Sequence, residues 1–122
     1  MNDEKLKILL VDDEQDLCKV AAWDLEDAGF EVTKAYGGFE ALDILKKNPF
    51  DFLVSDIKMP NGDGVELIRN IQENGFSLKG VYLMTGYADY PEKSLKDLGM
   101  TKLFQKPIDI EEVISEINKQ KV

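Results

Sequence analysis

Acidic, hydroxyl and basic side chains follow directly after short apolar runs at several points of this sequence. An adjacent acidic pair follows the first run, and a third acid, a hydroxyl and an ammonium follow later runs: Asp12, Asp13, Asp56, Thr85 and Lys106. If these runs are neighbouring strands of one parallel sheet, the five side chains meet at its carboxyl edge, where open α/β sheets bind ligands. Together they would form a site for a divalent cation and a phosphoryl group.

Each of these residues also has a purely structural interpretation. One of Asp12 and Asp13 could cap the helix that follows, and Asp56 could be a turn residue before a loop rich in Pro, Asn and Gly. Thr85 suits a strand end because it is β-branched, and Lys106 could be a surface lysine. As a set, the three acids suit a hard, oxygen-liganded cation such as Mg²⁺. Without a cation, their mutual repulsion would raise at least one pKa.

The pattern of apolar residues predicts the elements that would bring these side chains together. Short apolar runs, most of them without alternation, predict strands at 7–11, 31–36, 52–55, 81–85 and 102–105. Apolar residues at helical spacing predict helices near 17–28 and at 39–47, 65–74, 91–98 and 109–119. Because short buried strands joined by helices need right-handed crossovers, we expect a parallel sheet in a three-layer α/β sandwich.

The first predicted helix carries several residues of interest. Its apolar residues at helical spacing, which we expect to face the core, are Leu17, Val20, Ala21, Leu25 and Ala28. Trp23 lies off this face, and we expect a neighbouring side chain to cover it in part, with a protein contact as the alternative. Cys18 is the only cysteine, so an internal disulfide is excluded and we expect a reduced thiol.

Length and composition limit the functions that are open to the chain. Its 122 residues predict one domain, 1–122, and its formal charge of −9 argues against nucleic-acid binding by this domain. The absence of histidine excludes histidine general bases and histidine-dependent triads. No apolar run has membrane-spanning length, and residues 1–5 lack the apolar stretch of a signal peptide, so we expect a cytoplasmic protein without membrane contact.

The ordered motifs resemble those of the receiver domain of bacterial two-component response regulators, over nearly the whole chain. In order they are Asp12-Asp13, Val54-Ser55-Asp56-Ile57-Lys58-Met59-Pro60 with Gly62-Asp63-Gly64, Met84-Thr85-Gly86, and Lys106-Pro107. The resemblance implies a flavodoxin-like (βα)5 three-layer sandwich with a parallel five-stranded sheet in the order 2-1-3-4-5. It also implies a signalling switch that catalyses only its own phosphorylation and dephosphorylation.

The resemblance assigns a phosphoacceptor and a metal site. Asp56 resembles the phosphoacceptor, which would take its phosphoryl group from a sensor histidine kinase or a histidine phosphotransfer protein. Asp13, Asp56 and the backbone carbonyl of Lys58 would bind Mg²⁺ directly, and Asp12 would act through a bound water. Mn²⁺ could take the place of Mg²⁺.

Further residues would contact the phosphoryl group or change with it. Lys106 would pair with one phosphoryl oxygen, Thr85 would donate its hydroxyl to another, and the Lys106-Pro107 bond would be cis. The family usually has an aromatic switch residue three positions before the lysine, where this chain has Leu103. We expect Thr85 to move toward the phosphate while Leu103 repacks with little contrast between states.

Three positions near the site would tune phosphorylation. The resemblance implies that the bulky Lys58 and Tyr87 restrict the attacking water and lengthen the lifetime of the phosphorylated state. It also implies that Gly86 leaves a gap for a small phosphodonor or a kinase histidine. The output face would comprise the fourth helix, fifth strand and fifth helix, with Lys93, Lys96, Lys102, Glu111 and Glu112. The residues of this face identify no downstream target. Whether phosphorylation leads to a homodimer stays open.

Two other classes of protein compete with this interpretation. A hydrolase or phosphotransferase with an aspartate nucleophile could share the sheet, but such enzymes usually need extra elements to cover the substrate. A degenerate receiver, used only for protein contacts, would have lost the acidic pair, the acceptor or the lysine, and all are present. EF-hand, dinucleotide-binding and P-loop motifs fail on spacing. Sequence alone leaves open whether the chain is a stand-alone receiver or part of a longer regulator.

Overall fold

Strands and helices alternate along the chain. The computed structural model describes residues 5–87 and 91–120, so residues 1–4 of the segment predicted to lack a signal peptide lie outside the described part. The elements are β1 (Lys7–Val11), α1 (Gln15–Asp27), β2 (Glu31–Ala35), α2 (Gly38–Lys47), β3 (Phe52–Asp56), α3 (Gly64–Asn74), β4 (Gly80–Thr85), α4 (Glu92–Asp97), β5 (Lys102–Gln105) and α5 (Ile110–Gln120). All ten predicted elements are present.

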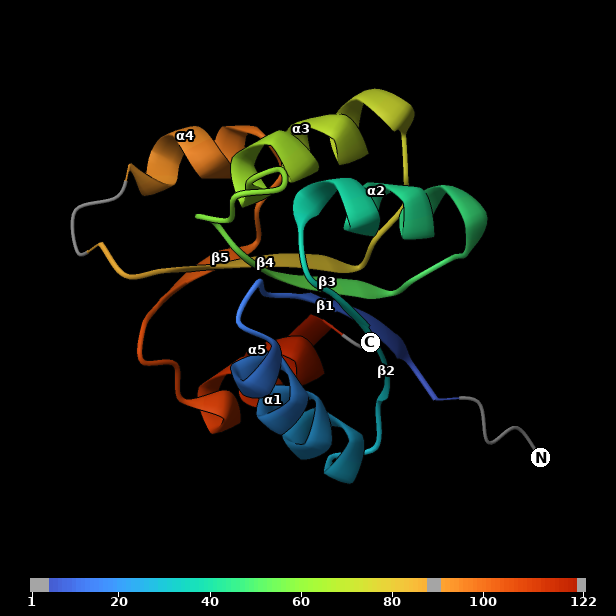
Figure 1. The fold of residues 1–122 in the computed structure, drawn as a ribbon, viewed down its shortest axis with the longest axis vertical. Helices are drawn as coiled ribbons and strands as arrows, with labels where there is room; N and C mark the ends of the chain where they lie inside the picture. The colour runs from blue at the N-terminus through green and yellow to red at the C-terminus, as the bar shows by residue number, and fades with distance from the viewer. Residues whose placement is uncertain (1–4, 88–90, 121–122) are drawn as a thin grey trace.

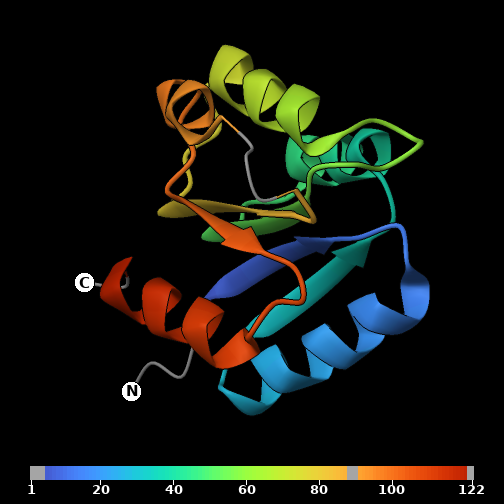
Figure 2. The same cartoon turned by 90° about the vertical axis from the view of Figure 1, so that its left-hand side faces the viewer.

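The five strands form one parallel sheet in the order β2-β1-β3-β4-β5. Helices α1 and α5 cover one face, and α2, α3 and α4 cover the other, as Figures 1 and 2 show. This arrangement confirms the predicted three-layer α/β sandwich and its strand order. Because the strands run parallel, their carboxyl ends lie at one edge, with Val11 beside Ser55 and Thr85 beside Gln105.

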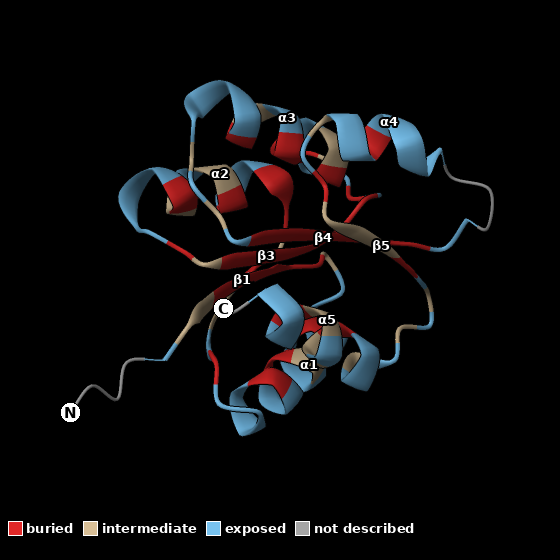
Figure 3. Ribbon diagram, turned by 180° about the vertical axis from the view of Figure 1, so that it is seen from behind, coloured by how far each residue is buried: buried red, intermediate tan, exposed pale blue. Residues whose placement is uncertain are grey.

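The central strands explain why the sheet is so strongly specified. All residues of β3 and β4 are buried, and Figure 3 shows this burial along the middle of the sheet. Alternate side chains enter two apolar clusters: Leu9, Leu53 and Leu83 pack toward α2, α3 and α4, whereas Leu10, Val54 and Met84 pack toward α1 and α5. Burying one such side chain contributes about 1.5–3 kcal/mol, so the strands are fixed on both faces.

The predicted inward face of α1 is correct only in part, since Leu25 is buried and Ala21 is half-buried against the core. Leu17 and Val20 are 54% and 52% exposed. The buried residues of this helix are Cys18, Ala22 and Leu25, which recur at i, i+4 and i+7. Trp23, expected to be partly covered by a neighbour, is 60% exposed. Apolar residues lie around much of the helix, so their spacing alone does not decide which face of α1 contacts the sheet. The small side chains of Cys18 and Ala22 suit close packing on the sheet.

Other predicted features of the helices agree with the structure. Leu67, Ile68 and Ile71 form the buried face of α3, and Val113 and Ile117 form that of α5. Among the described residues, no helix combines the length and the apolar character needed to cross a membrane.

Candidate functional site

Three carboxylates meet at the carboxyl edge of the sheet. Asp12 and Asp13 follow β1, and Asp56 ends β3; one oxygen of each lies within 4.8 Å of one from each of the others. Asp12 and Asp56 are buried, and Asp13 is half-buried. The structure therefore brings together the three acids that the sequence singled out. Their oxygen atoms form the donor set that hard cations such as Mg²⁺ and Mn²⁺ prefer.

Backbone bonds hold Asp12 in place. Its amide donates to the carbonyl of Ala35, with the two atoms 3.1 Å apart, and its Oδ1 accepts from the amide of Glu14 at 3.0 Å. The N-cap of α1 is Glu14, and its own side chain makes no capping hydrogen bond. The alternative that one of the aspartate pair is the N-cap of α1 is therefore wrong. Asp12 instead braces the loop that carries Asp13.

Lys106 supplies a positive charge to the acidic cluster. Its Nζ lies 2.7 Å from Oδ2 of Asp56, and its backbone amide donates to the carbonyl of Thr85 at 2.8 Å. The Lys106-Pro107 bond is cis, as predicted. One ammonium faces three carboxylates here, so the cluster keeps a net negative charge that a divalent cation would neutralise.

The electrostatics of the cluster follow from burial and from close charges. Burial is the main cause that raises the pKa of Asp12, with smaller contributions from Asp56 and Asp13, whereas the Glu14 amide and Lys106 oppose the rise. Burial alone would lower the pKa of Lys106, but its hydrogen bond to Asp56 and the charges of Asp56, Asp12 and Glu14 raise it above its ordinary value. The predicted rise of one carboxyl pKa is confirmed, but burial outweighs repulsion as its cause.

Thr85 ends β4 at the same edge and is 2% exposed. Its Oγ1 accepts from the amide of Tyr87 at 3.1 Å, and a hydroxyl that accepts one bond keeps its own proton to donate. Leu103 packs in part against the apolar cluster toward α3 and α4, whereas Phe104 lies in the opposite cluster, its ring centroid 6.0 Å from that of Tyr82. The expected repacking of Leu103 concerns a second state and stays a prediction.

Two loops approach each other above the strand ends. Nζ of Lys58, in the loop after β3, lies 5.1 Å from the centre of the Tyr87 ring, in the loop after β4. A Cβ atom placed on Gly86 would meet nothing within 4 Å, so there is open space beside this residue. The bulky pair and the gap predicted from the sequence thus lie in adjacent loops.

The loop after β3 is braced at its far end. Asp63 Oδ1 caps α3 by accepting from the amide of Glu66 at 2.8 Å. Gly62 has φ of 90°, which favours glycine, and a Cβ on Gly64 would come within 2.5 Å of the carbonyl oxygen of Asp56. These contacts fix the short stretch that carries Asp56.

Two polar residues at this edge were not singled out in the sequence. Ser55 Oγ donates to the carbonyl of Asp56 at 2.9 Å, and Gln105 Nε2 donates to the carbonyl of Tyr87 at 2.7 Å. The available signal was weak: each is a polar side chain that directly precedes a charged residue of the set, Asp56 or Lys106.

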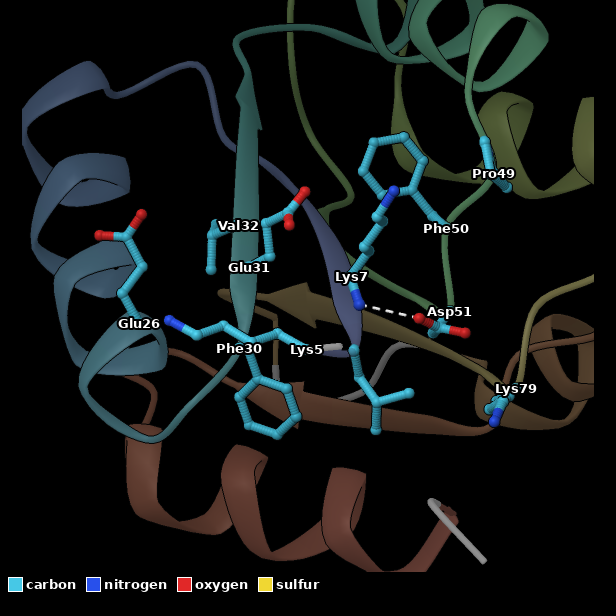
Figure 4. A pocket seen from close by; sticks show the side chains of 11 residues that line it. Lys5, Lys7, Glu26, Phe30, Glu31, Val32, Pro49, Phe50, Asp51 and Lys79 are labelled. Atoms are coloured by element: carbon cyan, nitrogen blue, oxygen red, sulfur yellow. Dashed lines mark hydrogen bonds between the residues drawn. The ribbon is translucent and has the colours of Figure 1, made fainter. Parts of the chain in front are cut away.

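A hollow of about 1030 Å³ at the opposite edge of the sheet lacks such a convergence of charge (Figure 4). Its charged residues balance and comprise Lys5, Lys7, Lys79, Glu26, Glu31 and Asp51. The Asp51 carboxylate already accepts from the Lys7 amide at 2.8 Å. A groove of about 550 Å³ adjoins the acidic cluster, and the exposed Leu17 and Val20 line it with Asp12 and Lys106.

Comparison with known proteins gives a consistent family. The response regulator receiver domain family matches residues 8–118. The receiver protein CpdR of Brucella abortus is 34% identical over 114 residues, which cover 93% of this chain and 94% of CpdR. The response regulator ArlR of Staphylococcus saprophyticus is 32% identical over 112 residues, or 91% of this chain, and the match spans only 50% of ArlR.

A solved structure agrees with these matches. The response regulator TrrA of Thermotoga maritima, in complex with Mg²⁺ and a beryllium fluoride, has a TM-score of 0.84 and 25% identity to this chain. The match covers 94% of this chain and 98% of TrrA.

Proposed function

The chain belongs to the response regulator receiver domain family, and on that premise we propose that it is the phosphoacceptor switch of a two-component system, with Asp56 as the acceptor. The observation that carries this proposal is the placement of Asp56: its carboxylate lies 2.7 Å from the Lys106 ammonium, beside two further carboxylates. Residues 1–122 would then form one receiver domain.

The transfer step uses Asp56 as the nucleophile. A carboxylate oxygen of Asp56 attacks the phosphorus of a phosphohistidine, and an O–P bond forms as the P–N bond breaks. The electron pair of the broken bond returns to the imidazole, which takes up a proton. Lys106 then pairs with a phosphoryl oxygen rather than with Asp56, and Thr85 donates its hydroxyl to another. This set needs no base of its own, because phosphoryl transfer depends mainly on position and charge.

The acidic cluster is the proposed metal site. Asp13, Asp56 and the backbone carbonyl of Lys58 would hold Mg²⁺, or Mn²⁺, directly, and Asp12 would hold it through water. The fit rests on three carboxylates with oxygens within 4.8 Å of one another and on their excess of negative charge. Bound there, the cation would neutralise charge that builds on the phosphoryl oxygens. The complex of TrrA with Mg²⁺ and beryllium fluoride supports this assignment.

The donor group must lie outside residues 1–122, because these contain no histidine. We assign the donor role to a sensor histidine kinase or a histidine phosphotransfer protein. We also propose that this chain receives the phosphoryl group in the cytoplasm. The gap beside Gly86 would admit the donor. After transfer, Thr85 and Leu103 would shift, and the face of α4, β5 and α5 would present the change to a downstream target.

Mass spectrometry of the intact protein tests the proposal. Incubation with acetyl phosphate and Mg²⁺ is expected to add one phosphoryl group. Asp56→Asn or removal of the metal should abolish the gain, whereas Asp43→Asn, at an exposed site on α2, should retain it. Release of phosphate from a simple phosphate ester over many turnovers, with no phosphoprotein, would instead support the aspartate-nucleophile hydrolase.

A further inference from the structure

We propose that Gln105 is a positioning residue that holds Tyr87 over Lys58 and thereby slows the loss of phosphate from Asp56. The proposal rests on the proposed function, because it concerns the lifetime of the phosphorylated state. It goes beyond the expectation that Lys58 and Tyr87 are bulky, since it names the residue that keeps them together.

The backbone of Tyr87 is tied on both sides. Its amide donates to Thr85 Oγ1 at 3.1 Å, and its carbonyl accepts from Gln105 Nε2 at 2.7 Å. Tyr87 as a residue is 54% exposed, so packing contributes little to its position. The ring nevertheless lies 5.1 Å from the Lys58 ammonium, within cation–π range. We therefore attribute its position mainly to the two backbone bonds.

Together with short stretches of chain, these contacts form a closed loop of contacts that includes the acceptor, Asp56. Asp56 pairs with Lys106, which directly follows Gln105 in the chain. Gln105 holds Tyr87, the Tyr87 ring meets Lys58, and Lys58 lies two residues after Asp56. Loss of the Gln105 side-chain amide would break this loop of contacts at one point. The Lys106–Asp56 ion pair and the bond to Thr85 Oγ1 would remain, because their donors are Lys106 Nζ and the Tyr87 amide.

This loop of contacts affects the rate at which the acyl phosphate on Asp56 is hydrolysed. In that step a water oxygen attacks phosphorus, the bond from phosphorus to Asp56 breaks, and the carboxylate leaves with the electron pair while the water proton passes to phosphate or solvent. Tyr87 and Lys58 restrict the approach of this water when they are held together. Losing one hydrogen bond that holds Tyr87 should speed decay by about twofold to tenfold, the range for a single neutral hydrogen bond.

A double-mutant comparison separates positioning from a general effect on stability. Gln105→Met keeps the length of the side chain and removes its donor, and Gln72→Met, at an exposed site on α3, is the matched control. We expect Gln105→Met and Tyr87→Ala each to speed decay of the phosphoprotein, and the double variant to decay no faster than Tyr87→Ala alone. Unchanged decay in either single variant, or effects that multiply in the double variant, would overturn the proposal.

A second measurement does not depend on phosphorylation. In the unphosphorylated protein, the Tyr87 ring should shift the NMR signals of the Lys58 side-chain protons upfield. Gln105→Met should weaken this shift and Gln72→Met should not; equal shifts in both variants would overturn the assignment of Gln105. If no variant takes up phosphate from acetyl phosphate, the proposed function fails, and this measurement still decides whether Gln105 positions Tyr87.

Discussion

Replacing Asp13 with asparagine should stabilise the metal-free protein. One carboxylate oxygen from each of Asp12, Asp13 and Asp56 lies within 4.8 Å of those from the other two. At that separation, one pair of like charges costs about 1 kcal/mol in a water-like medium and about 3.5 kcal/mol at an effective dielectric constant of about 20. Asp13 is half-buried and Lys106 offsets part of the repulsion, so we expect a net gain of about 1–2 kcal/mol in the free energy of unfolding.

Thermal unfolding with and without Mg²⁺ measures this effect. In metal-free buffer, Asp13→Asn should raise Tm by about 3–8 °C relative to the unmodified protein. Saturating Mg²⁺ should stabilise the unmodified protein by about 2.7 kcal/mol at 100 times Kd, and should have little effect on the variant. Asp43→Asn, which removes a carboxylate from an exposed site on α2, is the matched control for net charge.

The reasoning would be refuted by the opposite pattern. If Asp13→Asn lowers Tm in metal-free buffer and responds to Mg²⁺ as strongly as the unmodified protein, the three carboxylates neither repel one another significantly nor share a cation. An equal gain from Asp43→Asn would assign the effect to net charge instead of to the cluster.

Three further predictions follow from buried groups and from the switch. Burial, with a smaller contribution from Asp12, raises the pKa of Cys18 to about 11, so iodoacetamide at pH 8 should label the native thiol at least about tenfold more slowly than the unfolded one; equal rates by intact mass would contradict this. Burial and then the Glu116 charge raise the pKa of Tyr82 to about 12. The native phenol therefore keeps its proton between pH 10 and 12 while the unfolded one loses it, and stability should fall by about 1.4 kcal/mol at pH 11 relative to pH 9. Urea unfolding should show this loss in the unmodified protein and not in Tyr82→Phe; parallel behaviour of the two would contradict it. In a crystal structure with Mg²⁺ and beryllium fluoride, Leu103 should repack while Phe104 stays against Tyr82, and a large rotation of Phe104 into the site would be contrary to the prediction.

The sheet and its functional edge could be predicted because their signals are local. Runs such as Phe52–Asp56 are buried on both faces, so they are apolar throughout and mark central parallel strands. Charged or hydroxyl residues that end such runs must lie at one edge once the strands are parallel. The positions of Asp56, Thr85 and Lys106 followed from this geometry alone.

The missed features depend on contacts between distant parts of the chain. The rotation of α1 is set by how Cys18 and Ala22 pack on the sheet, and apolar residues such as Leu17 on its other side made the spacing ambiguous. Gln105 bonds to a backbone carbonyl 18 positions away, at Tyr87, and a backbone acceptor leaves no mark on residue type. Trp23 is 60% exposed, so the expected partial cover leaves most of its surface open, and spacing along one helix could not give the extent of that cover.

Locating the phosphoryl group within the protein tests the central claim most directly. After incubation with acetyl phosphate and Mg²⁺, borohydride reduction of the acyl phosphate followed by peptide mass spectrometry identifies the modified side chain. We predict that Asp56 alone is converted and that chelating the metal prevents the conversion. Modification of a different carboxylate, or of none while Mg²⁺ is present, would contradict the account.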